Sequence, residues 1–357
     1  MKNKILSVSF FTIIVSIFFI NVFTKDKELS YTERRKLNSF PKITWNSLLD
    51  GQAMEEFDNY TLDQFAFREE FRSLKTLVNL NIFRKLDNNN IFIKDSFIFK
   101  YEYPLREEKV LSFNKKMNNL YDNYLKEMKV YYTIIPDKNY FLSDNYLKLD
   151  YEKLFTLVND GLKNMKYIDI TSDLELEDYY YTDTHWRQDK ILKIVKKLSD
   201  QMHFDYIDNY KINEYKPFYG VYYGQAALKT KADTIRYLTN DYIDSATVKD
   251  LDSDLKTVYE ISSLGKMDSY DVFLSGATPL ITITNKKAST DKELIIFRDS
   301  FGSSIAPLLI PGYSKITLVD LRYINPSDLP NYIEFKNQDV LILYNTLVIN
   351  NSDTIRN

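Results

Sequence analysis

The chain has 357 residues, a net charge of −3 and no cysteine. The missing cysteines exclude disulfides and thiolate metal sites. Charges of both signs are interspersed, which argues against a nucleic-acid partner. Apolar residues make up 44% of the chain, so it can form a substantial core in one large or two ordinary domains.

Residues 1–24 predict a membrane anchor. Lys2 and Lys4 precede an uncharged apolar run from Ile5 to Phe23, and a helix of about 20 apolar residues crosses the hydrocarbon core of a bilayer. A cleaved signal usually has a shorter apolar stretch that ends in small residues, whereas this run is bulky to its end. We therefore expect an uncleaved single-pass anchor, with the bulk of the chain outside the cytoplasm.

The polar residues 25–50 predict a linker, and residues 51–357 predict one folded domain. That domain begins with a helical pattern from Gln52 to about Leu86, in which apolar residues recur three and four apart. The Tyr-rich segment 206–291 is less regular. We interpret it as an insertion or a strand-rich flap near the functional site.

From residue 91 onward, short apolar runs alternate with helical patterns. The runs predict strands at Ile91–Lys100, Val130–Ile135, Tyr167–Ile170, Leu294–Phe297, Ile316–Val319 and Val340–Tyr344. The patterns between several of them predict helices at Leu105–Met128, Tyr151–Met165 and Trp186–Met202. This alternation predicts an α/β fold, with a parallel sheet covered by helices on both faces. Such sheets bind ligands at the carboxyl ends of their strands.

Two histidines are present, and histidine is the usual general base near neutral pH. His203 ends an amphipathic helix, where a histidine commonly interacts with the helix terminus. His185 follows a loop, and Asp183 lies two residues before it. A carboxylate there can bind one ring nitrogen and leave the other to take a proton from a nucleophile. The structural alternative is that Asp183 caps the helix beginning near Trp186.

A serine lies where an apolar strand runs into a helix. The strand Leu294–Phe297 leads into a D-S-F-G turn that contains Ser300. Such a turn exposes the hydroxyl at the carboxyl end of the strand and directs backbone N–H groups to the same point. An ordinary serine cap is the alternative. Combined with the histidine motif, the turn favours nucleophilic catalysis by Ser300.

These motifs resemble the DHHW family, which is similar to the alginate O-acetyltransferases and groups with SGNH-like esterases and acyltransferases. The resemblance covers nearly the whole chain. It rests on ERRKLNSFP (33–41), Asp63, Phe65, Arg68, IPDKNY (135–140), YYYTDTHW (179–186), FYGVYYGQ (218–225), FRDSFG (297–302) and DVLILYN (339–345). It implies an SGNH-hydrolase-like catalytic domain over residues 51–357, behind an N-terminal transmembrane helix.

The resemblance also implies a catalytic triad. Ser300 would be the nucleophile, His185 the general base and then the general acid, and Asp183 the residue that orients His185. The backbone N–H of Ser300 or Phe301 would bind the oxyanion, together with Gly220.

Trp186, Lys138 and Tyr140 are candidates for an acceptor groove, with ordinary loop packing as the alternative. The sequence departs from the family pattern in two places. Thr184 replaces the middle histidine of the namesake motif, and Val221 follows the glycine of the middle motif, where a small residue is usual.

The function expected is transfer of an acetyl group, through an acyl-serine, to sugar hydroxyls of an exported polysaccharide. No acetyl-CoA is present outside the cytoplasm, so we expect a multispanning membrane acyltransferase of the MBOAT type as donor. The resemblance gives no reason to add a metal or organic cofactor.

Three other readings stay open. An acetyl esterase would use the same triad, and a non-catalytic polymer-binding subunit of an export complex would use none of it. A glycosidase would need paired carboxylates, and the acids Glu175, Glu177 and Asp178 do not form a distinctive pair. Two histidines without cysteine disfavour a zinc site.

Overall fold

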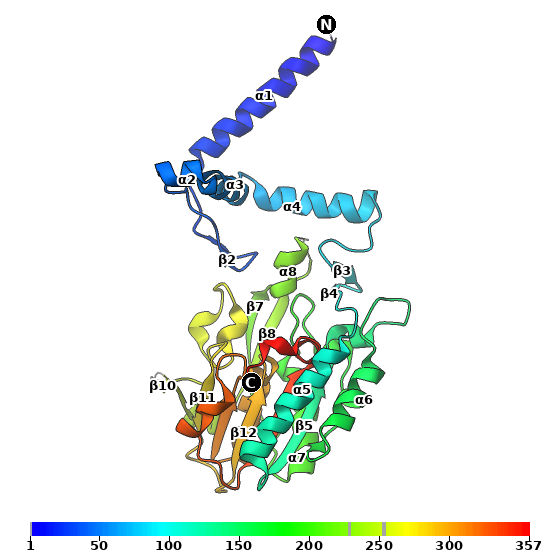
Figure 1. The fold of residues 1–357 in the computed structure, drawn as a ribbon, viewed down its shortest axis with the longest axis vertical. Helices are drawn as coiled ribbons and strands as arrows, with labels where there is room; N and C mark the ends of the chain where they lie inside the picture. Colours follow the sequence, from blue (N-terminus) through cyan, green and yellow to red (C-terminus); the bar gives the residue numbers. More distant parts are fainter. Residues whose placement is uncertain (1, 228–229, 252–254) are drawn as a thin grey trace. The chain divides into compact units, whose positions relative to one another are not determined.

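The computed structural model describes residues 2–227, 230–251 and 255–357. They form two compact units (Figure 1). The first contains the chain up to Asn89 together with Tyr223–Thr230. The second contains Asn90–Tyr222 and Lys231–Asn357.

An eight-stranded sheet forms the centre of the second unit. Its strands are β5 (Lys129–Ile135), β6 (Lys166–Tyr167), β9 (Thr247–Asp250), β10 (Leu255–Lys256), β11 (Leu280–Thr284), β12 (Glu293–Arg298), β13 (Lys315–Val319) and β14 (Asp339–Asn345). The strand order is β10-β9-β11-β13-β12-β14-β5-β6. Strands β13, β12, β14, β5 and β6 run parallel, whereas β11 pairs antiparallel with both β13 and β9.

The predicted α/β class is confirmed, but the sheet is mixed rather than wholly parallel. The difference comes from the segment 206–291, which contributes β9, β10 and β11 to one edge of the sheet. These residues therefore extend the core in addition to any role near the site. β9 and β10 are short and partly polar, so their sequence does not predict buried strands. β11, with the sequence LITIT, has the apolar and β-branched character of a central strand and was missed within the irregular segment.

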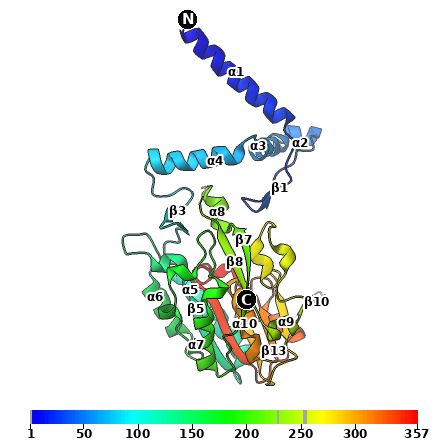
Figure 2. The same ribbon diagram turned by 180° about the vertical axis from the view of Figure 1, so that it is seen from behind.

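Helices cover both faces of this sheet (Figures 1 and 2). The longer ones are α5 (Glu107–Leu120), α6 (Tyr151–Gly161), α7 (Leu192–Met202) and α10 (Phe301–Leu309). In β12, Ile295 and Phe297 pack in one core with α5 and α6, whereas Leu294 and Ile296 pack in another with α7 and α10. Successive side chains of a strand point to opposite faces, so both faces of β12 are buried and the whole strand is apolar.

Shorter elements complete this part of the chain. They are the hairpins β3 (Ile91–Lys94) with β4 (Phe97–Lys100) and β7 (Lys211–Phe218) with β8 (Asp233–Thr239), and the helices α9 (Asp241–Ser245) and α11 (Thr346–Ile349). Helix α8 (Val221–Ala226) begins in this unit and continues into the first unit from Tyr223. The run 91–100 is thus a hairpin and not one strand, because Asp95 and Ser96 both take left-handed backbone angles, φ 49° and 71°. The helix expected from Trp186 begins only at α7.

The first unit is mainly helical. Its elements are α1 (Lys2–Phe23), β1 (Leu29–Ser30), β2 (Arg35–Lys36), α2 (Trp45–Leu49), α3 (Gln52–Gln64), α4 (Arg68–Leu77) and a π-helix, Val78–Ile82, that continues α4. The stretch Asn3–Phe23 has a mean hydropathy of 2.4 and is long and apolar enough to cross a membrane. The helical pattern after Gln52 is two helices, because Phe67 adopts a left-handed φ of 60° between them.

Candidate active site

The structure brings Asp183, His185 and Ser300 together in the second unit. His185 Nδ1 lies 2.6 Å from Asp183 Oδ1, and His185 Nε2 lies 2.8 Å from Ser300 Oγ. Asp183 is fully buried, His185 is 9% exposed and Ser300 is partly exposed. A carboxylate on Nδ1 holds the proton there and leaves Nε2 to accept the serine proton.

Ser300 lies between the end of β12 and the start of α10, in a turn that Asp299 holds. The Asp299 carboxylate accepts hydrogen bonds from the N–H of Phe301 (2.9 Å) and from the N–H of Asn345 at the end of β14 (2.7 Å). Burial raises the pKa of Asp299, and these amide donors oppose that rise. Asp299 therefore ties the serine turn to the neighbouring strand.

Because residue 302 is glycine, the first turn of α10 can pack closely against Arg298 at the end of β12. A Cβ added there would lie 2.6 Å from Cβ of Arg298, so a larger residue would displace the first turn of α10. Arg298 is itself fully buried, with Nη1 3.5 Å from Asp320 Oδ2. Burial lowers the pKa of Arg298, although Asp320 opposes this.

The loop that carries Asp183 is held in place by a second buried carboxylate, Asp233 at the start of β8. Asp233 accepts the N–H of Tyr181 (2.8 Å), the N–H of Thr182 (2.7 Å) and the Thr182 hydroxyl (2.6 Å). Burial raises its pKa, and these donors oppose the rise. Thr184 accepts a hydrogen bond from the Tyr222 hydroxyl (3.2 Å), so this departure from the family motif serves the loop.

Gly220 and Val221 complete the surroundings of Asp183. The Val221 N–H donates to Asp183 Oδ2 at 2.8 Å. A Cβ added at Gly220 would lie 2.2 Å from Cβ of Asp183 and 2.4 Å from its Cα. The chain therefore needs glycine at 220 in order to pass close enough for Val221 to bind the carboxylate.

The amides expected to bind an oxyanion are engaged elsewhere. The Gly220 N–H donates to Thr182 Oγ1 at 2.8 Å, and the Phe301 N–H donates to the Asp299 carboxylate. In the structure, both N–H groups make hydrogen bonds within their own loops, and their role as oxyanion donors stays a prediction. The assignment of the Ser300 N–H to that role stays a prediction.

Trp186 is not a groove residue, because it is completely buried. Its Nε1–H donates to Ser304 Oγ at 2.9 Å, and its ring meets the ring of Phe301 edge-on at 5.6 Å between centroids. Trp186 thus fixes the histidine loop against the first turns of α10.

The other two candidate groove residues also pack into the protein. Lys138 is 3% exposed, and its Nζ donates to the backbone carbonyls of Tyr180 (3.1 Å) and Tyr181 (3.3 Å). Burial lowers the pKa of Lys138 to about 7, and nearby carboxylates, Asp183 first, oppose this. The Tyr140 ring packs edge-on against Tyr151, 5.2 Å between centroids, on the α6 side of the sheet.

Tyr270 is part of the site, although no motif in the sequence pointed to it. Its ring stacks on the His185 imidazole with 3.8 Å between centroids and 9° between planes. Its hydroxyl donates to Ser304 Oγ at 2.9 Å, the atom that also accepts from Trp186. Burial raises the pKa of Tyr270 well above 10, so the hydroxyl stays a neutral donor. Tyr270 therefore packs against one face of the His185 imidazole and limits its rotation.

No family model matches the chain, and no curated protein matches it. Solved structures do. A DHHW family protein from Eubacterium siraeum aligns at 17% identity, over 75% of this chain and 94% of that chain, with a TM-score of 0.62. PatB1 from Bacillus cereus aligns at 18% identity, over 73% and 97%, with a TM-score of 0.58. At such identities the likeness shows the fold alone. The chain has the α/β fold of a DHHW family protein, as its motifs predicted.

Proposed function

We propose that the chain is a membrane-anchored, extracytoplasmic O-acetyltransferase that modifies hydroxyls of an exported polysaccharide. The observation that carries the proposal is the line of hydrogen bonds from Ser300 Oγ to His185 Nε2 (2.8 Å) and from His185 Nδ1 to Asp183 Oδ1 (2.6 Å). The motif resemblance supports the reaction class, and the shared fold with a DHHW family protein is consistent with it.

In the first half-reaction, Ser300 Oγ attacks the carbonyl carbon of an acetyl ester while its proton passes to His185 Nε2. The tetrahedral adduct then collapses, and the leaving oxygen takes that proton from His185. Asp183 stabilises the imidazolium that exists between the two proton transfers. The product is an acetyl ester on Ser300 and a free alcohol.

In the second half-reaction, a sugar hydroxyl attacks the acetyl-serine. His185 takes the hydroxyl proton and then returns a proton to Ser300 Oγ, which restores the enzyme. If water replaces the sugar, the same steps give acetate and the protein is an esterase. Transfer and hydrolysis thus differ only in the acceptor.

The helix α1 supports placing this chemistry at a membrane, because it is long and apolar enough to span one. In the proposed orientation the rest of the chain lies outside the cytoplasm. The acetyl group must then be delivered through the membrane, and we propose a multispanning acyltransferase of the MBOAT type as the immediate donor.

The first test is cleavage of p-nitrophenyl acetate by the full-length protein in detergent. Ser300→Ala should lower the rate by about 10⁴-fold or to background. The matched control is Ser303→Ala, a serine of the same helix outside the hydrogen-bonded line, and it should retain activity. Equal rates for the native protein and Ser300→Ala would overturn the proposal.

Covalent labelling gives an independent readout. PatB1 of Bacillus cereus, 15% identical in this alignment, has been solved with a sulfonyl adduct. We expect a sulfonyl fluoride to modify Ser300 in this chain, and mass spectrometry of peptides should place the adduct there. His185→Ala should prevent it, because the hydroxyl is a weak nucleophile without its base.

Transfer is then distinguished from hydrolysis by adding oligosaccharides to the active protein. Acetylated sugar found by mass spectrometry would establish the transferase, and acetate alone would identify an esterase. Inactivity of the native protein with every ester, and no labelling, would favour a polymer-binding subunit.

A further inference from the structure

Two helices of the first unit, α3 and α4, turn apolar side chains outward. In α4 the exposed apolar residues recur every three or four positions, and Leu74 is 54% exposed. On α3, Met54 and Leu62 are exposed as well, at 62% and 67%. We call this set the apolar face: Met54, Leu62, Phe67, Phe71, Leu74 and Leu77. More large apolar residues lie exposed on either side of it in the chain: Trp45, Leu49, Ile82, Phe83 and Leu86.

The polar face of α4 is the one that packs within the unit. Arg72 Nη2 donates to the carbonyl of Gly224 at 2.9 Å, and the buried Thr76 hydroxyl lies 3.2 Å from the carbonyl of Ala226. A surface helix of a water-soluble domain normally buries its apolar stripe and exposes its charges. α4 instead exposes its apolar stripe, next to the exposed charges of Glu70 and Lys75. Water alone is therefore not the expected solvent for this side of the helix.

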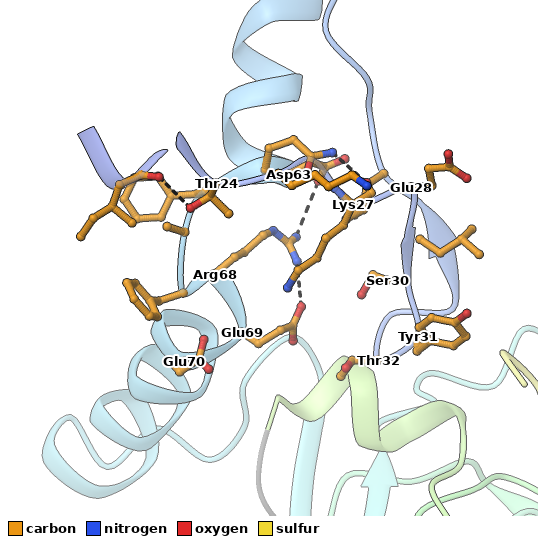
Figure 3. Close-up of a pocket in the computed structure, with 18 residues that line it drawn as sticks. Thr24, Lys27, Glu28, Ser30, Tyr31, Thr32, Asp63, Arg68, Glu69 and Glu70 are labelled. Carbon is orange, nitrogen blue, oxygen red and sulfur yellow. Dashed lines mark hydrogen bonds and ion pairs between the residues drawn. The ribbon is translucent and has the colours of Figure 1, made fainter. Parts of the chain in front are cut away.

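Ion pairs lock this orientation (Figure 3). Arg68 lies between Asp63 and Glu69, with its guanidinium 3.2 Å from Glu69 Oε1 and 2.7 Å from Glu33 Oε2. Asp63 is 7% exposed and accepts a hydrogen bond from Arg35 Nη1 at 2.8 Å. That bond holds the pKa of Asp63 well below its ordinary value. Rolling α3 or α4 to bury the apolar face would expose and separate these charges.

The elbow between α3 and α4 is attached to the anchor helix. Asn21, in the last turn of α1, accepts the Ala66 N–H through Oδ1 at 2.7 Å. Ala66 lies between the two helices, and Phe65 and Phe67 flank it on the exposed side. If α1 crosses a bilayer, its last turn is near the lipid surface, and this bond keeps the elbow there.

We propose that α3 and α4 lie flat in the interface of the bilayer that α1 crosses, with the apolar face among the lipid chains and the ion-pair network toward water. This is the arrangement of an amphipathic interfacial helix. Acidic and basic residues nearly balance between positions 42 and 86, so apolar contact provides the binding. It therefore does not require anionic lipid and persists at high salt.

The proposal goes beyond the proposed enzymatic function and does not depend on it. It assigns residues 52–77 to the membrane surface, whereas the sequence analysis interpreted them as the start of the catalytic domain. The catalytic serine plays no part, so loss of the proposed chemistry would leave this inference intact. The two ideas share only the premise that α1 crosses a membrane.

The absence of cysteine from the chain allows a direct test. Single variants Phe71→Cys and Leu74→Cys, at exposed positions outside any core, are labelled with an environment-sensitive dye. The full-length protein is reconstituted into vesicles of zwitterionic lipid. Lys126→Cys, in the second unit and with a side chain 57% exposed, is the water-facing control. Phe10→Cys in α1 is the lipid-facing control.

Lipid with a quencher on its acyl chains should quench the dyes at positions 71, 74 and 10 several-fold more than the dye at 126. Iodide in the water should quench the dye at 126 more than the dyes at positions 71, 74 and 10, at low and at high salt. Iodide access at 71 and 74 equal to that at 126 would overturn the proposal. So would protection of 71 and 74 from both quenchers, since protein would then cover the face. Failure of lipid to quench the dye at 10 would remove the membrane premise and the proposal with it.

Discussion

The two units use amphipathic helices in opposite ways. In the second unit, α7 buries Ile194, Val195 and Leu198 completely against the sheet and leaves its lysines outside. In the first unit, α4 buries Thr76 and exposes Leu74. Both helices repeat apolar residues at helical spacing, so the pattern predicts that one face of each helix is removed from contact with water. The pattern does not distinguish whether that face packs against protein or inserts among lipids.

Truncating one apolar residue in each unit should produce the largest difference between the two units in the free energy of unfolding. Ile342 in β14 is 1% exposed, and Ile342→Ala should lower the free energy of unfolding by about 2–5 kcal/mol through lost burial and a cavity. Leu74→Ala removes an exposed side chain and should change it by less than about 0.5 kcal/mol. Denaturant unfolding in detergent measures both. A similar large loss for Leu74→Ala would show that α4 packs against protein.

Glycine substitutions test how closely each unit is packed around its loops. Gly220→Ala forces Val221 or Asp183 to move, because the new Cβ would lie 2.2 Å from Cβ of Asp183. A displaced triad should cost about 10²-fold in esterase rate. Gly51→Ala, before α3, meets no atom within 4 Å and strains only its own backbone at φ 82°. Retained activity in Gly220→Ala, measured with p-nitrophenyl acetate beside Gly51→Ala, would contradict the proposed importance of this close approach.

Lys138 should give the second unit a stability that rises with pH. Its pKa is about 7 in the folded protein, against about 10.4 in an unfolded chain. Between these values the unfolded chain binds more protons, so the free energy of unfolding increases by about 1.4 kcal/mol per pH unit. From pH 7 to pH 9 the native protein should gain about 2 kcal/mol relative to Lys138→Met.

Denaturant midpoints of both proteins at the two pH values measure this difference. Lys126→Met, which removes an exposed lysine on the same unit, should keep the native pH dependence. Parallel pH profiles for the native protein and Lys138→Met would contradict a neutral buried amine.

The sequence alone was sufficient for the central strands and for the residues that meet at the site. β12 and β14 are buried on both faces, so their apolar runs were visible without a structure. Asp183 and His185 are two residues apart, and Ser300 follows shortly after an apolar strand, so local chemistry pointed to each of them. The long apolar run of α1 likewise identified a candidate membrane helix.

Tertiary structure alone decided what surrounds those residues. Tyr270 stacks on His185, and Asp233 fastens the loop from a distant strand, because the fold brings segments together that no local pattern connects. Trp186 and Lys138 looked available for substrate and are buried instead. Side-chain type shows what a residue can do, whereas burial and the direction of its hydrogen bonds depend on the packing of remote elements and decide whether it reaches a ligand.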